Sequence, residues 1–187
     1  SFYLPNLDGG GAERVMINLA NNLIEQNYEV ELILTKNQGK YNDFLNDKIS
    51  VIDLNCLRVS HSLFKLVRVI NNRKPKIIIS ALNHANIIVS LANLIAMNKS
   101  SHIMTVHNTI FKKKSFIKDY IILLLMRLFS IFSTAIVAVS ESVRDELINQ
   151  LFFNKKKTRV IYNPINCDHI KKQSQKISKK IILPKKF

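Results

Sequence analysis

Short runs of β-branched and apolar residues alternate along the chain with stretches in which apolar residues recur every three or four positions. The first pattern predicts strands, and the second predicts helices with one buried face. The predicted strands are Phe2–Leu4, Glu29–Thr35, Ser50–Leu54, Lys76–Ser80, His102–His107, Ala135–Val139 and Arg159–Tyr162. The predicted helices are Ala12–Gln26, a helix through Leu63, Leu66, Val67 and Ile70, then Ala85–Met97, Phe116–Phe132 and Glu141–Leu151. This alternation predicts an α/β fold: a doubly wound, mainly parallel Rossmann-like sheet with helices on both faces.

Three segments carry more specific expectations. The run Lys76–Ser80 is continuously apolar, which is typical of a strand buried on both faces. A polar loop is expected over Lys36–Lys48. The predicted helix Ala85–Met97 has a polar side, which consists of Asn86, Ser90 and Asn93.

The segment Tyr120–Val139 is almost wholly apolar and has the length of a membrane span. Arg127 lies near its centre, and three hydroxyl residues, Ser130, Ser133 and Thr134, interrupt it. A central charge disfavours a span, so a core helix followed by a buried strand is the preferred interpretation. A helix that faces a membrane is a second alternative, because its apolar residues run nearly all round it.

Length and composition indicate one globular domain in a reducing compartment. The chain has 187 residues, of which 47% are hydrophobic. Its two cysteines, Cys56 and Cys167, lie far apart without a CxxC pattern, so free thiols and a cytoplasmic location are expected. No signal peptide is visible. The chain begins at Ser1 next to a strand-like run, and we expect a few N-terminal residues to be missing.

The net charge of +15 is concentrated at one end of the chain. Residues 155–187 carry 11 Lys/Arg and one acid, Asp168, whereas residues 1–154 carry 17 Lys/Arg and 12 acids. A lysine-rich tail is usually solvated, and otherwise favours acidic lipid or nucleic acid without choosing between them. No basic stripe rich in aromatic residues is present. Nucleic acid is therefore not an expected partner.

Three of the four glycines, Gly9, Gly10 and Gly11, lie between the first predicted strand and its helix. Glycines let a ligand approach the backbone closely, and a helix N-terminus offers free N–H groups to an anion, so this turn could seat a phosphate. Arg14 stands where the dinucleotide fingerprint needs its third glycine, and the Gly-Lys-Ser/Thr of a phosphate loop is absent. A plain tight turn is the alternative interpretation.

Further candidate residues follow later predicted strands, at the edge where parallel sheets bind ligands. His107 and Asn108 end the fifth strand, and a histidine there could act as acid or base near neutral pH, or be structural. Ser140 is placed to cap the next helix, with Glu141 in its first turn, and capping alone explains most of this pair. Asn163 precedes a proline in a turn or domain exit. No cluster has metal-ligand spacing.

Four segments in order resemble the N-terminal, acceptor-side domain of a GT4-family glycosyltransferase with the GT-B fold. They read Gly-Gly-Gly-Ala-Glu-Arg, Thr-Val-His-Asn, Ala-Val-Ser-Glu-Ser-Val-Arg-Asp-Glu-Leu and Val-Ile-Tyr-Asn-Pro-Ile-Asn, and the resemblance runs from about Phe2 to Asp168. It implies retaining transfer from a nucleotide-sugar donor to a saccharide or lipid-linked acceptor, in polysaccharide or glycolipid biosynthesis. Two Rossmann-like domains would face a cleft, with no metal and no cofactor.

The resemblance also implies roles for individual residues. Gly10 and Gly11 would lie near the donor diphosphate, and His107, the predicted catalytic residue, would contact the donor sugar or the reacting centre. Ser140 and Glu141 would line the cleft, and Asn163 would lie at its hinge side. The predicted substrate-binding set is Gly9, Gly10, Gly11, Glu13, Asn108, Ser140, Glu141 and Asn163.

The motifs of the family's donor-binding second domain, Gly-Arg…Lys-Gly and two glutamates eight residues apart, are not found. We therefore expect a domain over 1–168 and a basic tail over 169–187 that begins a missing or truncated second domain. The chain alone is expected to be inactive, with a second chain as a candidate partner. A fragment, a truncated gene product and half of a split enzyme all remain open. Lys112, Lys113 and Lys114 precede the apolar helix, so a non-catalytic, peripheral subunit on the inner face of the membrane is the alternative.

Overall fold

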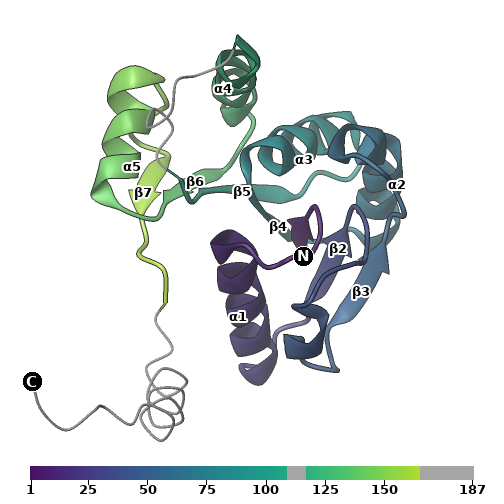
Figure 1. The fold of residues 1–187 in the computed structure, drawn as a ribbon. Coiled ribbons are helices and arrows are strands. Elements are labelled where there is room, and N and C mark those ends of the chain that lie inside the picture. Colours follow the sequence, from purple (N-terminus) through teal and green to yellow (C-terminus); the bar gives the residue numbers. More distant parts are fainter. Residues whose placement is uncertain (109–116, 165–187) are drawn as a thin grey trace, which may run out of the picture.

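A parallel sheet of seven strands, ordered β3-β2-β1-β4-β5-β6-β7, is the centre of the computed structural model, which describes residues 1–108 and 117–164 (Figure 1). The strands are β1 (Phe2–Leu4), β2 (Glu31–Leu34), β3 (Ser50–Asp53), β4 (Ile77–Ala81), β5 (Ser101–Val106), β6 (Ala135–Ala138) and β7 (Thr158–Val160). The helices are α1 (Gly11–Glu25), α2 (Leu63–Arg73), α3 (Asn83–Ile95), α4 (Ile117–Ser130) and α5 (Glu141–Asp145). The predicted doubly wound, Rossmann-like architecture is confirmed, with every predicted strand and helix present.

The side chains of β1 show why helices are needed on both faces. Phe2 and Leu4 point to one face and pack in the core cluster that contains α1. Tyr3, between them, packs on the other face with α2 and α3. All three side chains are almost completely buried, so a strand of this composition is stable only when both faces are covered. Figure 1 shows α1 on the opposite side of the sheet from α2 and α3.

The other half of the sheet is covered on one face only, among the residues described. Met104 of β5 and Ile136 of β6 pack against Leu123 and Met126 of α4, which lies beside α3. On the opposite face α1 reaches only the β1, β2 and β4 side chains of its own core cluster. Lys76 and Ile77 at the start of this segment are exposed, Ile77 by 46%. The prediction that Lys76–Ser80 is buried on both faces was therefore wrong for these two residues.

Several element ends differ from the sequence expectation. The predicted helix Glu141–Leu151 is α5 followed by a π-helical turn, η3 (Glu146–Gln150). Two 3-10 turns, η1 (Asn42–Phe44) and η2 (Val59–Ser62), interrupt the connections that flank β3. The apolar segment Tyr120–Val139 divides into α4 and β6, and within residues 1–108 and 117–164 no helix is long and apolar enough to cross a membrane.

Of the two cysteines, Cys56 lies within the described residues. Cys56 is a buried free thiol, as predicted. Cys167, the domain boundary at residue 168, the tail 169–187 and the cluster Lys112–Lys114 lie outside the described residues.

Candidate functional site

The order in which successive strands are added to the sheet reverses between the ends of β1 and β4. β1 leads through α1 to β2 on one side, whereas β4 leads through α3 to β5 on the other. Open parallel sheets bind ligands at such a reversal, outside the carboxyl ends of the strands. Because all strands are parallel, the segments after β1, β5, β6 and β7 share that edge. These segments contain every predicted site residue: Gly9, Gly10, Gly11, Glu13, His107, Asn108, Ser140, Glu141 and Asn163.

The predicted residues are not equally close to one another along the edge. Neighbouring strands lie about 4.8 Å apart, so the end of β5 is roughly 10 Å from the end of β1, and β7 is roughly 19 Å from it. The glycine turn and His107 are thus within reach of one ligand the size of a sugar phosphate. Ser140, Glu141 and Asn163 lie farther along the edge, where a larger ligand would be needed to connect them with the turn.

The glycine turn is held from behind by the loop that follows β2. The amide of Leu7 donates to the carbonyl oxygen of Gln38 at 2.8 Å, and the amide of Tyr41 donates to the carbonyl oxygen of Leu7 at 3.1 Å. Gly39 has φ +121°, and a Cβ there would overlap the Leu7 backbone. The polar loop therefore positions the turn, and it can do so only with a glycine at position 39.

The three glycines of the turn have different surroundings. A Cβ on Gly9, which has φ +117°, would overlap the side chain of Lys40, and a Cβ on Gly10 would overlap the Glu13 carboxylate. A Cβ on Gly11 would meet nothing within 4 Å. Gly9 and Gly10 thus make room for a cation and an anion of this chain, whereas the space beside Gly11 is open to a ligand.

Glu13 is a buried carboxylate in the first turn of α1, with 9% of its surface exposed. In the part of the chain that the structure describes, no hydrogen bond or ion pair to it is found. The free N–H groups and the positive dipole end of the helix favour a negative charge there. The Glu13 carboxylate is thus suited to accept hydrogen bonds from a ligand's hydroxyl groups.

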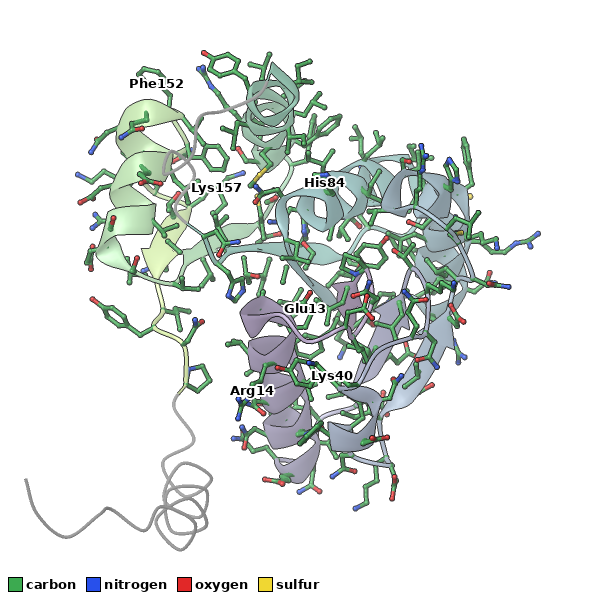
Figure 2. The ribbon with its side chains drawn as sticks, in the orientation of Figure 1. Glu13, Arg14, Lys40, His84, Phe152 and Lys157 are labelled. Atoms are coloured by element: carbon green, nitrogen blue, oxygen red, sulfur yellow. The ribbon has the colours of Figure 1, made fainter. Side chains whose placement is uncertain are left out.

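Two basic side chains that the sequence did not single out lie at the same place. Figure 2 shows Glu13 at the N-terminal end of α1, Lys40 on the neighbouring loop and His84 on α3. The Lys40 ammonium lies beside Gly9, and His84 is exposed in the first turn of α3, directly after β4. The signal that could have revealed Lys40 is Gly39, the fourth glycine of the chain, which directly precedes it.

The hydrogen bonds of His107 define its tautomer. The Thr105 hydroxyl donates to the carbonyl oxygen of Ser80 at 2.8 Å, since a carbonyl can only accept. The contact of 3.1 Å between Thr105 Oγ1 and His107 Nε2 then requires Nε2 to carry the hydrogen. Nδ1 is left as a buried acceptor, with no hydrogen-bond partner among the residues that the structure describes. Burial lowers the pKa of His107, which favours this neutral form at pH 7.

Behind the edge lies a network of buried polar side chains centred on His102. Its Nε2 is 2.7 Å from Ser80 Oγ, and its Nδ1 is 3.1 Å from Ser90 Oγ and 3.2 Å from Ser133 Oγ. Burial lowers the pKa of His102 to about 3, so the ring is neutral at ordinary pH. The network joins α3 to β4 and β5, and the amide of Asn86 donates to the Thr105 carbonyl oxygen at 2.9 Å. It thereby supports the strand end that carries Thr105 and His107.

The polar side predicted for the third helix, α3, is buried in the structure. Asn86, Ser90 and Asn93 are 0%, 1% and 8% exposed. Each has a buried partner: Asn86 and Ser90 join the network, and Asn93 exchanges hydrogen bonds with the backbone of Ser100 at 2.7 and 2.8 Å. The buried side of α3 therefore carries polar as well as apolar side chains, because β4, β5 and Ser100 supply matching donors and acceptors.

The remaining predicted residues have local roles or are exposed. Ser140 caps α5 as predicted, since its hydroxyl accepts from the Val143 amide at 3.3 Å. Glu141 accepts from the Arg144 guanidinium at 2.8 Å. Asn108 and Asn163 are exposed at the edge. Across residues 1–108 and 117–164, no group of three or more His, Cys, Asp or Glu side chains could hold a metal ion.

Solved structures of similar fold span about twice the length of this chain. A TM-score of 0.70 and 17% identity relate it to Anabaena HepE in complex with UDP and glucose, with 95% of this chain and 49% of that chain covered. A glycosyltransferase from Rickettsia africae gives a TM-score of 0.67 at 21% identity, with coverage of 98% and 49%. The lipopolysaccharide outer core galactosyltransferase WaaB gives 0.63 at 15%, with coverage of 88% and 45%. A comparison with curated proteins gave no match.

These similarities show the fold, and the fold is that of one half of a GT-B glycosyltransferase. The sequence itself gives the family. The model of Glycosyltransferase Family 4 matches residues 9–169, from the glycine turn past the last strand. The chain therefore belongs to Glycosyltransferase Family 4.

Proposed function

We propose that this chain forms one wall of a crevice in which a sugar is transferred, with retention of configuration, from a nucleotide-sugar donor to a saccharide or lipid-linked acceptor. Family membership supports the reaction class, and the similar fold of Anabaena HepE, whose structure contains UDP and glucose, supports the donor class. In the transfer, the acceptor oxygen bonds to the anomeric carbon as the bond to the diphosphate oxygen breaks. The hydroxyl proton leaves with the nucleoside diphosphate.

The observation that carries this proposal is the unpartnered, buried Nδ1 of His107 on the same sheet edge as the glycine turn. An acceptor nitrogen buried without a partner costs stability, about 1–3 kcal/mol. A hydroxyl of a bound sugar would supply the missing donor. His107 would in this way orient the sugar whose anomeric carbon reacts.

The charges around the glycine turn suggest where the diphosphate and the sugar of the donor would lie. The open space beside Gly11, the free amides of α1 and the Lys40 ammonium suit the oxygens of a diphosphate. The Glu13 carboxylate would repel a phosphate placed directly over Gly10, and instead suits sugar hydroxyls. Asn108, Ser140, Glu141 and Asn163 would contact the more distant part of donor or acceptor. We propose no resident metal or cofactor.

The chain spans about half the length of the solved chains it matches. We therefore propose that a second domain or second chain supplies most donor contacts, and that the 187-residue chain alone turns over little sugar. A cytoplasmic location follows from such donors. The second candidate, a non-catalytic membrane-associated subunit of a split glycosyltransferase, is favoured by the exposed apolar residues of α4.

The test uses the purified chain with UDP-glucose and GDP-mannose, observed by saturation-transfer NMR and by release of nucleotide. We expect weak binding, no turnover, and a loss of binding of about tenfold in His107→Ala, the value of one good hydrogen bond. The matched control is His61→Ala, an exposed histidine that follows β3, four strands away from β5 in the sheet. Equal binding by His107→Ala and His61→Ala would refute the role of His107. Robust turnover by the chain alone would refute the need for a second domain.

A further inference from the structure

The outward face of α4 and the residues after it expose an unusual amount of apolar surface. Leu123 and Met126 point inward and are 5% and 0% exposed. On the other side, six large side chains are between 46% and 66% exposed: Tyr120, Ile121, Leu124, Leu128, Ile131 and Phe132. Contiguous apolar surface of this kind on a folded chain indicates a binding surface.

Phe152 extends this surface from the loop between η3 and β7. Its side chain is 68% exposed, its φ is +53°, and the Arg127 guanidinium lies over its ring at 5.1 Å. A mainly apolar groove of about 550 Å³ lies between Phe152, the α4 side chains Leu124 and Leu128, and Ile131 just after α4. We refer to these seven apolar residues, the six above and Phe152, as the α4 patch.

The sequence that contributes to the α4 patch is mainly basic. The sequence has no acidic residue between Asp119 and Glu141, and none between Glu146 and Asp168. The same two stretches contain five cations: Arg127, Lys155, Lys156, Lys157 and Arg159. The Lys157 ammonium donates to the carbonyl oxygens of Ile131 and Ser133, at 2.8 and 2.9 Å, and so attaches the basic loop to the end of α4 (Figure 2).

We propose that the α4 patch docks on an anionic lipid surface, with α4 lying in the plane of the interface. Aliphatic side chains would enter the acyl boundary, the aromatic Tyr120, Phe132 and Phe152 suit the headgroup level, and the basic residues meet lipid phosphates. A second copy of this chain is disfavoured as the occupant. A symmetric contact would bring the cations of the two copies together, which is unfavourable.

The position of α4 relates this surface to the sugar site. A helix that connects two parallel strands runs back across the sheet, so the Tyr120 end of α4 lies toward the carboxyl edge, where His107 ends β5. A docked chain would hold that edge near the lipid. This last step rests on the proposed function and selects the lipid-linked class of acceptor; the docking itself does not depend on it.

The experiment exploits the absence of tryptophan from the sequence. In Phe152→Trp the new indole reports on the α4 patch, and in the control Phe64→Trp it reports on α2, where Phe64 is 77% exposed. With vesicles of phosphatidylcholine and phosphatidylglycerol, we expect a blue shift and flotation for Phe152→Trp, weakened about tenfold by high salt. Phe64→Trp should float equally well but show no blue shift. A blue shift in both or in neither would overturn the proposal.

Two double variants separate the α4 patch from the lysine-rich tail, which both retain. Leu124→Gln with Leu128→Gln, and Lys155→Glu with Lys156→Glu, should each weaken vesicle binding at least about tenfold. Circular dichroism should show unchanged folding, because all four side chains are exposed. Wild-type vesicle affinity in both double variants would assign binding to the tail and overturn the proposal. So would self-association of the wild type that Leu124→Gln with Leu128→Gln abolishes, since the occupant would then be a second copy.

Discussion

The two ends of β5 each carry a histidine, and the two rings have opposite surroundings. His102, at the start, is completely buried, and both of its nitrogens face serine hydroxyls. His107, just past the end, has one nitrogen on Thr105 and one that is buried without a partner. The first ring satisfies the groups around it, whereas the second is left for a ligand to satisfy. We therefore interpret the fully hydrogen-bonded ring of His102 as structural, and the incompletely hydrogen-bonded ring of His107 as part of the candidate site.

The glycines divide in the same way. Gly39 is enclosed by the Leu7 backbone, so its missing side chain serves the fold. Gly11 has no neighbour within 4 Å of where a side chain would begin, so its missing side chain serves no internal contact. Residues such as Gly39 and His102, which are surrounded by other residues of the chain, thus lie behind the carboxyl edge. Residues such as Gly11 and His107, which have room or an unused hydrogen-bonding atom, form its surface.

The largest expected effect comes from removing the ring of His102. In His102→Ala the hydroxyls of Ser80, Ser90 and Ser133 lose their common partner and a cavity replaces the imidazole. We expect the free energy of unfolding to fall by about 4 kcal/mol. Urea denaturation followed by circular dichroism measures this. If His107→Ala costs as much, the distinction between the two histidines fails.

Gly39→Ala should have the next largest effect. The substitution combines a strained φ of +121° with an overlap on Leu7, and we expect a loss of about 2–3 kcal/mol. The same urea measurement on Gly11→Ala is the matched control, where the change should stay within about 1 kcal/mol of zero. Equal costs at the two positions would contradict the assignment of Gly39 behind the edge and of Gly11 to its surface.

Acidification should expose the low pKa of His102. Its pKa is about 3 in the fold against 6.5 when exposed. Between these values the unfolded chain binds a proton that the folded chain does not, so stability falls as the pH falls, by about 1.4 kcal/mol per unit. The contribution is complete above pH 6.5. The stability difference between wild type and His102→Ala should therefore shrink by about 1 kcal/mol from pH 6.5 to 5.5, where the unfolded chain is only partly protonated, and an unchanged difference in urea titrations would count against it.

His107 should give the smallest effect on stability and a clear one on binding. His107→Ala should change the free energy of unfolding by less than about 1 kcal/mol. The substitution removes one hydrogen bond, to Thr105, but it also removes the cost of the buried Nδ1 that has no partner. Because burial lowers its pKa, Nδ1 stays an acceptor above that lowered value and becomes a donor below it. Sugar binding, measured by NMR, should therefore weaken only as the pH falls through that lowered pKa. Binding that strengthens on acidification would reverse the assigned role.

The sequence was sufficient for the sheet and for the glycine turn, because both depend on local patterns. Apolar spacing predicts each strand and helix, and three adjacent glycines between a strand and a helix are a local signal. It was insufficient for the residues behind the edge. Asn86 and Ser90 could be assigned to a polar side of the helix, but their partners could not be predicted. Asn86 bonds Ser80 and Thr105, and Ser90 bonds His102 and Ser133, all in other strands and loops.

Lys40 and Glu13 show the same limit at the site. A lysine in a polar loop resembles any solvated lysine, and its place beside Gly9 depends on the pairing of two loops about 30 residues apart. Glu13 was identified through its motif, but its burial and lack of a partner depend on the packing of α1. The surroundings of Lys40 and Glu13 depend on contacts between distant segments, and hydrophobic pattern and motif spacing could not predict them.

The contact between Gly39 and Leu7 makes the shape of the glycine turn depend on the loop after β2, a segment outside the turn. Lengthening or shortening the loop after β2 would shift Gly9 and Gly10 without altering either residue. Relatives of this chain can therefore diverge in ligand preference while their glycine motif stays the same, and a comparison of motifs alone would overlook the change.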